Sequence, residues 1–141
     1  MAAKLERFSI SMKGDLLRQL DNLVKSKGYA NRSQAIADMV KSGLVEHHGQ
    51  QPDGDVAGSV TLVYDHHKRN IQSLITKIQH EYGGLIIAAL HAHLDHHNCM
   101  ELLAVRGKAR DVRKLADKLQ SARGIKHGKL SITTEEEVLE L

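Results

Sequence analysis

The chain has 141 residues, a formal net charge of +3 and a sequence pI near 9.0. Hydrophobic residues make up 41% and charged residues 26%, an ordinary composition for a soluble globular protein. No apolar run approaches the roughly 20 residues of a membrane span, and the N-terminus lacks the apolar run of a secretory signal. The single cysteine excludes an internal disulfide, so we expect a cytoplasmic protein. Because no membrane span is predicted, we expect no membrane partner.

The first predicted element is a short strand in which polar and apolar residues alternate. Its apolar side carries Phe8, Ile10 and Met12, and its polar side carries Arg7, Ser9 and Ser11. Two amphipathic helices follow, the first closed by Gly28 and the second capped by Asn31, with Gln34 at the capping-box position. So short a segment buries too little apolar surface to fold alone. It therefore predicts an intertwined homodimer with a two-stranded antiparallel ribbon.

The polar face of this ribbon predicts DNA binding. A two-stranded ribbon fits the major groove, where Arg7 can donate two hydrogen bonds to guanine while Ser9 and Ser11 contact other bases or phosphates. The start of the second helix, at Asn31, Arg32 and Ser33, would face phosphate. This pattern resembles the ribbon-helix-helix family of DNA-binding repressors, which implies a DNA-binding domain over residues 1–46. The alternative is an oligomerisation hairpin with a solvated outer face.

A second domain is predicted after a linker. Residues 47–58 hold the only proline and no apolar periodicity, so we expect an irregular linker. Residues 59–134 read as β-α-β-β-α-β, the ferredoxin-like arrangement that ACT-type sensing domains share. Within it, the apolar run 85–94 predicts a central strand. Residues 135–141 form an acidic tail, and the fold class is α+β.

The stretch from His91 to Cys99 holds four of the ten histidines and the only cysteine. Along a strand, His91 and His93 project from one face. If Asp95–Asn98 forms a hairpin loop, Leu94 faces Cys99 and the thiol lies beside His93. This clustering favours a metal site over the alternative of half-buried histidines with a cysteine packed as a small hydrophobe.

His91, His93 and Cys99 supply three ligands, and most metal sites need a fourth. His80, at the end of the predicted helix around 71–78, is the leading candidate, and a subunit contact would bring it to a neighbour's strand. Imidazole and thiolate donors suit Ni(II), Cu(II), Zn(II) and Co(II). A water molecule in the fourth position would suit a zinc enzyme, although no familiar hydrolase motif is present. A regulator whose ACT-like domain binds an amino acid, with structural histidines, is the other alternative.

The two-domain order and the spacing His80…His91-x-His93-x5-Cys99 resemble the NikR family of nickel-responsive transcriptional regulators over about residues 7–133. The resemblance implies a regulator rather than an enzyme, with one square-planar Ni(II) per subunit bound by His91, His93 and Cys99 of one subunit and His80 of another. It also implies a homotetramer, a dimer of dimers, that binds a palindromic double-stranded operator and controls nickel uptake. Lys68 and Arg69 are expected to contact DNA phosphate, unless they form a solvated helix start.

Overall fold

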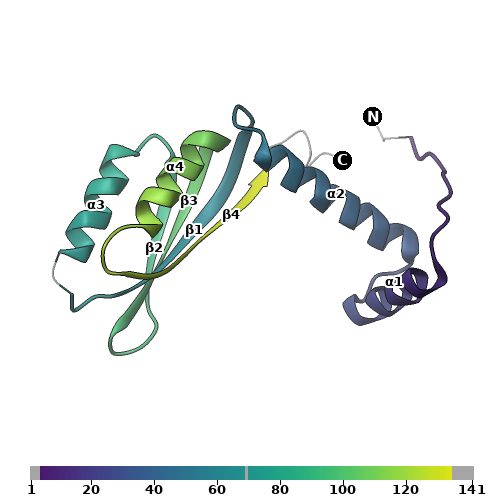
Figure 1. The fold of residues 1–141 in the computed structure, drawn as a ribbon, viewed down its shortest axis with the longest axis horizontal. Coiled ribbons are helices and arrows are strands. Elements are labelled where there is room, and N and C mark those ends of the chain that lie inside the picture. Colours follow the sequence, from purple (N-terminus) through teal and green to yellow (C-terminus); the bar gives the residue numbers. More distant parts are fainter. Residues whose placement is uncertain (1–3, 69, 135–141) are drawn as a thin grey trace. The chain divides into compact units, whose positions relative to one another are not determined.

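The computed structural model describes residues 4–68 and 70–134, in two compact units that divide between Val40 and Lys41. The elements labelled in Figure 1 are α1 (Gly14–Lys27), α2 (Arg32–Gln50), β1 (Asp55–Asp65), α3 (Ile71–Glu81), β2 (Ile86–His93), β3 (Asn98–Lys108), α4 (Ala109–Gln120) and β4 (Ile125–Thr134). No helix in the described ranges has the length and hydropathy needed to cross a bilayer. The predicted acidic tail, residues 135–141, lies outside them.

In the first unit, capping interactions define the end of α1 and the start of α2. Helix α1 ends at Gly28, which adopts the left-handed conformation (φ 74°) that glycine accepts without strain. Asn31 Oδ1 accepts a hydrogen bond from the backbone N–H of Gln34 at 2.9 Å, and Gln34 Oε1 accepts one from the N–H of Ala30 at 2.8 Å. The predicted caps at Gly28 and Asn31 are confirmed.

The predicted N-terminal strand forms no ladder in the single chain, where residues 4–13 carry no regular secondary structure. Phe8 is 77% exposed and Ile10 is 52% exposed. A strand obtains its hydrogen bonds from a neighbour, and the expected neighbour is the same stretch of a second copy. The ribbon therefore stays a prediction.

The second unit is a four-stranded antiparallel sheet in the order β2-β3-β1-β4. Helices α3 and α4 cover one face of this sheet (Figure 1). An aliphatic core fills the space between them, with Leu62, Leu103, Leu115 and Leu119 all fully buried. The strand and helix order is that of the ferredoxin-like fold, so the predicted α+β class is confirmed.

Strand β2 lies at an edge of the sheet, and the prediction of a central strand is wrong. Ile87 is 58% exposed and Leu90 is 62% exposed. A continuous apolar run indicates burial on both faces, but it does not show whether the residues that bury the strand belong to the same chain or to another. Within this chain, much of the apolar surface of β2 remains open.

The predicted irregular linker over 47–58 is also wrong in its extent, because α2 continues to Gln50 and β1 begins at Asp55. Arg113 Nη2 donates to the carbonyl oxygen of Gly49 at 2.6 Å. A Cβ on the buried Gly49 would lie 2.7 Å from Cγ2 of Ile132. Gly49, inside the predicted linker, therefore marks a close approach of helix to strand.

Substitution of Gly49 tests this contact. Gly49→Val is expected to lower the free energy of unfolding by about 1–3 kcal/mol, because overpacking a tight contact costs about that much. The matched control is Gly43→Val in the same helix, where a Cβ meets no atom of the described residues within 4 Å. The control should change stability by less than about 0.5 kcal/mol. Denaturant unfolding followed by circular dichroism measures both, and equal effects would contradict the contact.

Candidate metal centre

The β2–β3 hairpin places Cys99 directly opposite His93. In its loop, Asp95 Oδ1 accepts the backbone N–H of Asn98 at 2.8 Å, and the N–H of Leu94 donates to the carbonyl oxygen of Asn98 at 2.9 Å. Leu94 therefore meets Asn98, and the predicted pairing of Leu94 with Cys99 is wrong by one residue. A slip of one residue turns a strand's side chains to the other face. The observed register puts the thiol and the His93 imidazole on the same face.

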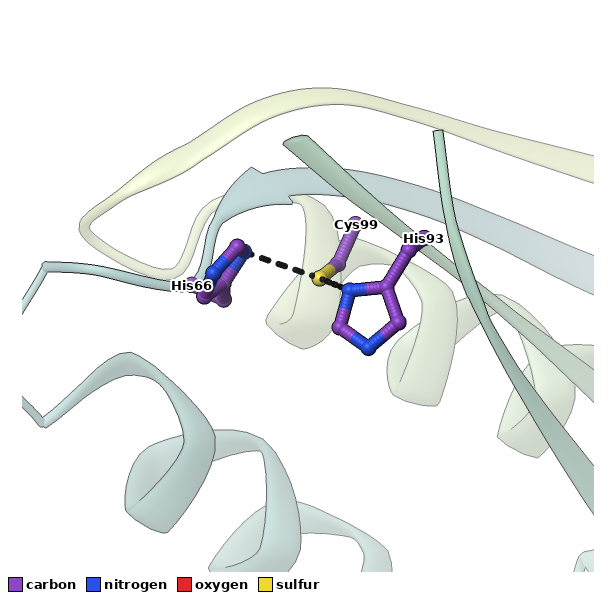
Figure 2. A group of neighbouring side chains, drawn as sticks. All are labelled: His66, His93 and Cys99. Atoms are coloured by element: carbon purple, nitrogen blue, oxygen red, sulfur yellow. Dashed lines mark hydrogen bonds between the residues drawn. The ribbon is translucent and has the colours of Figure 1, made fainter. Parts of the chain in front are cut away.

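Three donor atoms meet at this end of the sheet. Cys99 Sγ lies 3.2 Å from Nδ1 of His66 and 3.3 Å from Nδ1 of His93, with the two rings on either side of the sulfur (Figure 2). All three donors lie within 4.8 Å of one another. A thiol has one proton and cannot donate to both nitrogens. Two imidazole nitrogens and a sulfur are donors that borderline transition-metal ions prefer, so these residues fit such an ion.

The protonation of this cluster follows from its burial. Burial, reinforced by nearby carboxylates, raises the pKa of the Cys99 thiol. Burial, together with two neighbouring histidines, lowers the pKa of His66. The imidazole of His66 is thus favoured in its neutral form, which has a lone pair to offer. The thiol would release its proton when a metal binds.

His91 belongs to a neighbouring hydrogen-bond network. Its Nδ1 lies 3.3 Å from the hydroxyl of Tyr64, which donates to Glu101 Oε2 at 3.0 Å. A hydroxyl that donates to Glu101 accepts from His91, which leaves the lone pair of His91 on Nε2. Gln79 Nε2 donates to the other carboxylate oxygen of Glu101 at 2.9 Å. Because Gln79 precedes His80, the network connects His91 to the helix that carries the predicted fourth ligand.

His80 does not join the cluster within one chain. Among the described residues, the donor groups close enough to hold one ion are His66, His93 and Cys99, and the overlapping set Asp65, His66 and His67. His80 is exposed in the last turn of α3. The ligand set of His80, His91, His93 and Cys99 therefore stays a prediction that requires a second copy.

His66 is a candidate ligand that the sequence pattern alone does not reveal. It directly follows β1, in which Tyr64 pairs with Cys99 of β3. The ferredoxin-like strand order makes β1 and β3 neighbours, so the topology predicts that a residue just past β1 lies beside the β2–β3 loop. That signal is long-range in sequence, whereas the His91–Cys99 pattern is local.

The predicted DNA-contacting residues are mostly accessible. Arg32 makes a bidentate ion pair with Asp21, with Nε 2.7 Å from Oδ1 and Nη2 2.9 Å from Oδ2. An exposed pair of this kind contributes little stability, so a phosphate can compete for the guanidinium. Arg69 lies outside the described residues. The exposed members of the predicted set are Arg7, Ser9, Ser11, Asn31, Arg32, Ser33 and Lys68.

Comparison with known proteins identifies the family. A family model described as the NikR C terminal nickel binding domain matches residues 57–133, which include the whole cluster. The chain belongs to the NikR family. A "Putative nickel-responsive regulator" of a Geobacter species is 52% identical over 128 residues, 91% of this chain and 92% of that one. Its namesake in Geobacter sulfurreducens is 50% identical over 133 residues, 94% and 96% of the two chains.

One solved structure supports the fold alone. An uncharacterized protein of Thermotoga maritima superposes with a TM-score of 0.50 at 13% identity, over 55% of this chain and 96% of that chain. Membership of the NikR family makes the chain a regulator and removes the zinc-enzyme alternative.

The loop that positions Cys99 should respond to acid through Asp95. Hydrogen bonds from Asn98 and from the backbone N–H of His97 lower the carboxyl pKa from 3.8 to about 2. Because the folded-state pKa is lowered, the ionised carboxylate stabilises the fold above about pH 4, and this contribution disappears as the pH falls toward 2. Asp95→Asn should therefore lower Tm at neutral pH, and its difference from wild type should shrink over that window.

Thermal melting across a pH series measures this effect, with Asp117→Asn, an exposed carboxylate on α4, as the matched control. The control should melt with the wild type throughout. A deficit in Asp95→Asn that stays constant from neutral pH to the acid end would show that the Asp95 charge does not stabilise the loop.

Proposed function

We propose that this chain is a nickel-dependent transcriptional repressor that binds a palindromic operator as a homotetramer and so controls nickel uptake. The observation that carries the proposal is the juxtaposition of His93 and Cys99, with Sγ 3.3 Å from Nδ1, in a chain of the NikR family. Imidazole and thiolate donors suit Ni(II).

In the proposed centre, His91, His93 and Cys99 of one chain and His80 of a second copy hold one Ni(II) per subunit. When bound, the ion supplies a link between donors on two chains. The β2–β3 register holds His93 and Cys99 in place, and Tyr64 fixes the ring of His91. The Gln79–Glu101 hydrogen bond holds the end of α3 against the sheet, which orients the helix that presents His80 to another copy.

Exposed apolar side chains support self-association. On and after edge strand β2, Ile87, Leu90 and Leu94 are 58%, 62% and 51% exposed. In the first unit, Phe8 and Leu16 are 77% and 56% exposed. Open apolar patches and an unpaired edge are typical of surfaces that another subunit covers. Two separate patches of this kind on one chain suit a dimer of dimers.

The first unit supplies the proposed DNA contacts. Residues 1–46 carry eight basic and five acidic residues, a mild excess that favours phosphate. Paired ribbons would present Arg7, Ser9 and Ser11 to the major groove, and Lys68 and Arg69 would contact phosphate. Coupling between the metal centre and the DNA-binding surface is reciprocal, so operator DNA should also tighten nickel binding.

Operator binding with and without Ni(II), at one fixed salt concentration, tests the proposal. The probe is a duplex that the nickel-loaded full-length protein selects from a random-sequence pool. We expect nickel to tighten binding by about 5–150-fold, the usual range of allosteric coupling. Cys99→Ala should lose this effect, because it removes the thiolate donor.

His127→Ala, which removes an exposed imidazole from β4, is the matched control and should keep the response to nickel. Equal affinity of the wild type with and without nickel would contradict a nickel-dependent repressor. Retention of the full response by Cys99→Ala would instead exclude Cys99 as a ligand. An ACT-like domain that senses an amino acid would give neither tight nickel binding nor a nickel response.

A further inference from the structure

The last turn of α3, which carries His80, is attached to helix α4 through one side chain. Lys118 Nζ donates a hydrogen bond to Oε2 of Glu81, the residue after His80, at 2.7 Å. The same ammonium lies 5.5 Å from the centroid of the Tyr82 ring, which is within the range of a cation–π contact. Lys118 therefore contacts both residues that directly follow His80.

Tyr82 also ties the end of α3 to the core and to β3. Its half-buried side chain packs against the core between the sheet and the helices. Its N–H donates to the carbonyl oxygen of Ile78 at 3.1 Å, and its carbonyl oxygen accepts the N–H of Leu85 at 2.9 Å. The carbonyl oxygen of Leu85 in turn accepts the N–H of Arg106 at 2.8 Å. The position of Tyr82 therefore restricts the path of the chain just after His80.

We propose that Lys118 is a positioning residue for nickel binding, which holds the last turn of α3 in the orientation that presents His80 to another copy. The inference rests on the proposed function, in which His80 is the ligand that one chain supplies to a second. On the other side of His80, Gln79 donates to Glu101 of β3. The turn is thus held from both α4 and β3, and neither contact uses the exposed imidazole of His80.

Preorganisation is the physical reason for the proposed effect. A ligand at a mobile helix end must be ordered when the ion binds, and this ordering lowers the affinity. Single exposed ion pairs contribute little, and the side chains of Lys118 and Glu81 are 48% and 41% exposed. Here, however, one ammonium contacts both a carboxylate and an aromatic ring, and the helix and the core already restrict these two groups.

The full-length Lys118→Met variant tests the inference, because methionine removes the ammonium and has a helix propensity close to that of lysine. We expect Ni(II) binding to weaken by about 3–10-fold, within the combined range of an exposed ion pair and a cation–π contact. Competition with a chromophoric chelator measures this affinity. In the protein without added metal, exchange of the Tyr82 amide hydrogen should accelerate by a similar factor, because both quantities depend on opening of the same turn.

Two further variants separate positioning from general stability. The matched control is Arg110→Met, which removes an exposed ion pair from the same helix, between Arg110 Nη1 and Oδ1 of Asp53 at 2.7 Å. Asp53 lies in the turn between α2 and β1, so this control should keep the wild-type nickel affinity and the wild-type exchange at Tyr82. Lys118→Arg keeps a cation that can make both contacts, and it should stay within about twofold of the wild type.

Three results would overturn the inference. The first is wild-type nickel affinity in Lys118→Met. The second is weaker nickel binding without faster exchange at Tyr82, which would mean that the charge acts without holding the turn. The third is an equal loss of affinity in Arg110→Met, which would indicate a general effect on stability. A wild type that binds no Ni(II) would instead contradict the proposed function, and hydrogen exchange would still decide whether Lys118 holds the end of α3.

Discussion

The antiparallel register of three adjacent strands is the constraint on which the candidate centre depends. Tyr64, Cys99 and His93 are consecutive partners across β1, β3 and β2, so backbone hydrogen bonds fix all three on the face that α3 and α4 cover. The cysteine is buried because its strand packs against the core, and the imidazoles reach it from an edge strand and from the end of β1. A slip of one residue in either ladder would turn a donor away. The pairing of the strands therefore determines where the donor atoms of the candidate centre lie, and the loops only complete the arrangement.

Local patterns predicted much of this structure, and long-range pairing accounts for most of what they missed. Period-two alternation places His91 and His93 on one face, and the caps at Gly28 and Asn31 depend only on neighbouring residues. His66 is brought to Cys99 by the β1–β3 ladder, which no local pattern contains. The apolar residues of β2 indicate burial without saying by which chain. Gly49 shows the remaining limit, because glycine permits both flexible turns and close packing, and only the position of Ile132 distinguishes the two.

The same edge of the sheet carries the candidate metal centre and exposed apolar residues of the second unit. Strand β2 exposes Leu90 on one face and presents His91 and His93 on the other. A series of hydrogen bonds links His91 through Tyr64 and Glu101 to Gln79, which directly precedes His80. Under the proposed function, assembly and metal binding therefore act on one structural element. A centre that one chain leaves incomplete is a means by which metal occupancy can control the arrangement of several chains, and so the spacing of two DNA-binding dimers.

The most direct test of the shared centre is nickel binding by a mixture of two variants. His80→Ala and Cys99→Ala chains are unfolded together, refolded together and loaded with Ni(II), and the wild-type thiolate-to-nickel absorption is recorded. Each variant alone is expected to lack that band. In mixed assemblies, the intact His80 of a Cys99→Ala chain meets the intact His91, His93 and Cys99 of a His80→Ala chain, so the band should return. A mixture that only sums the two separate spectra, or a His80→Ala protein that keeps the full band alone, would contradict a centre shared between copies.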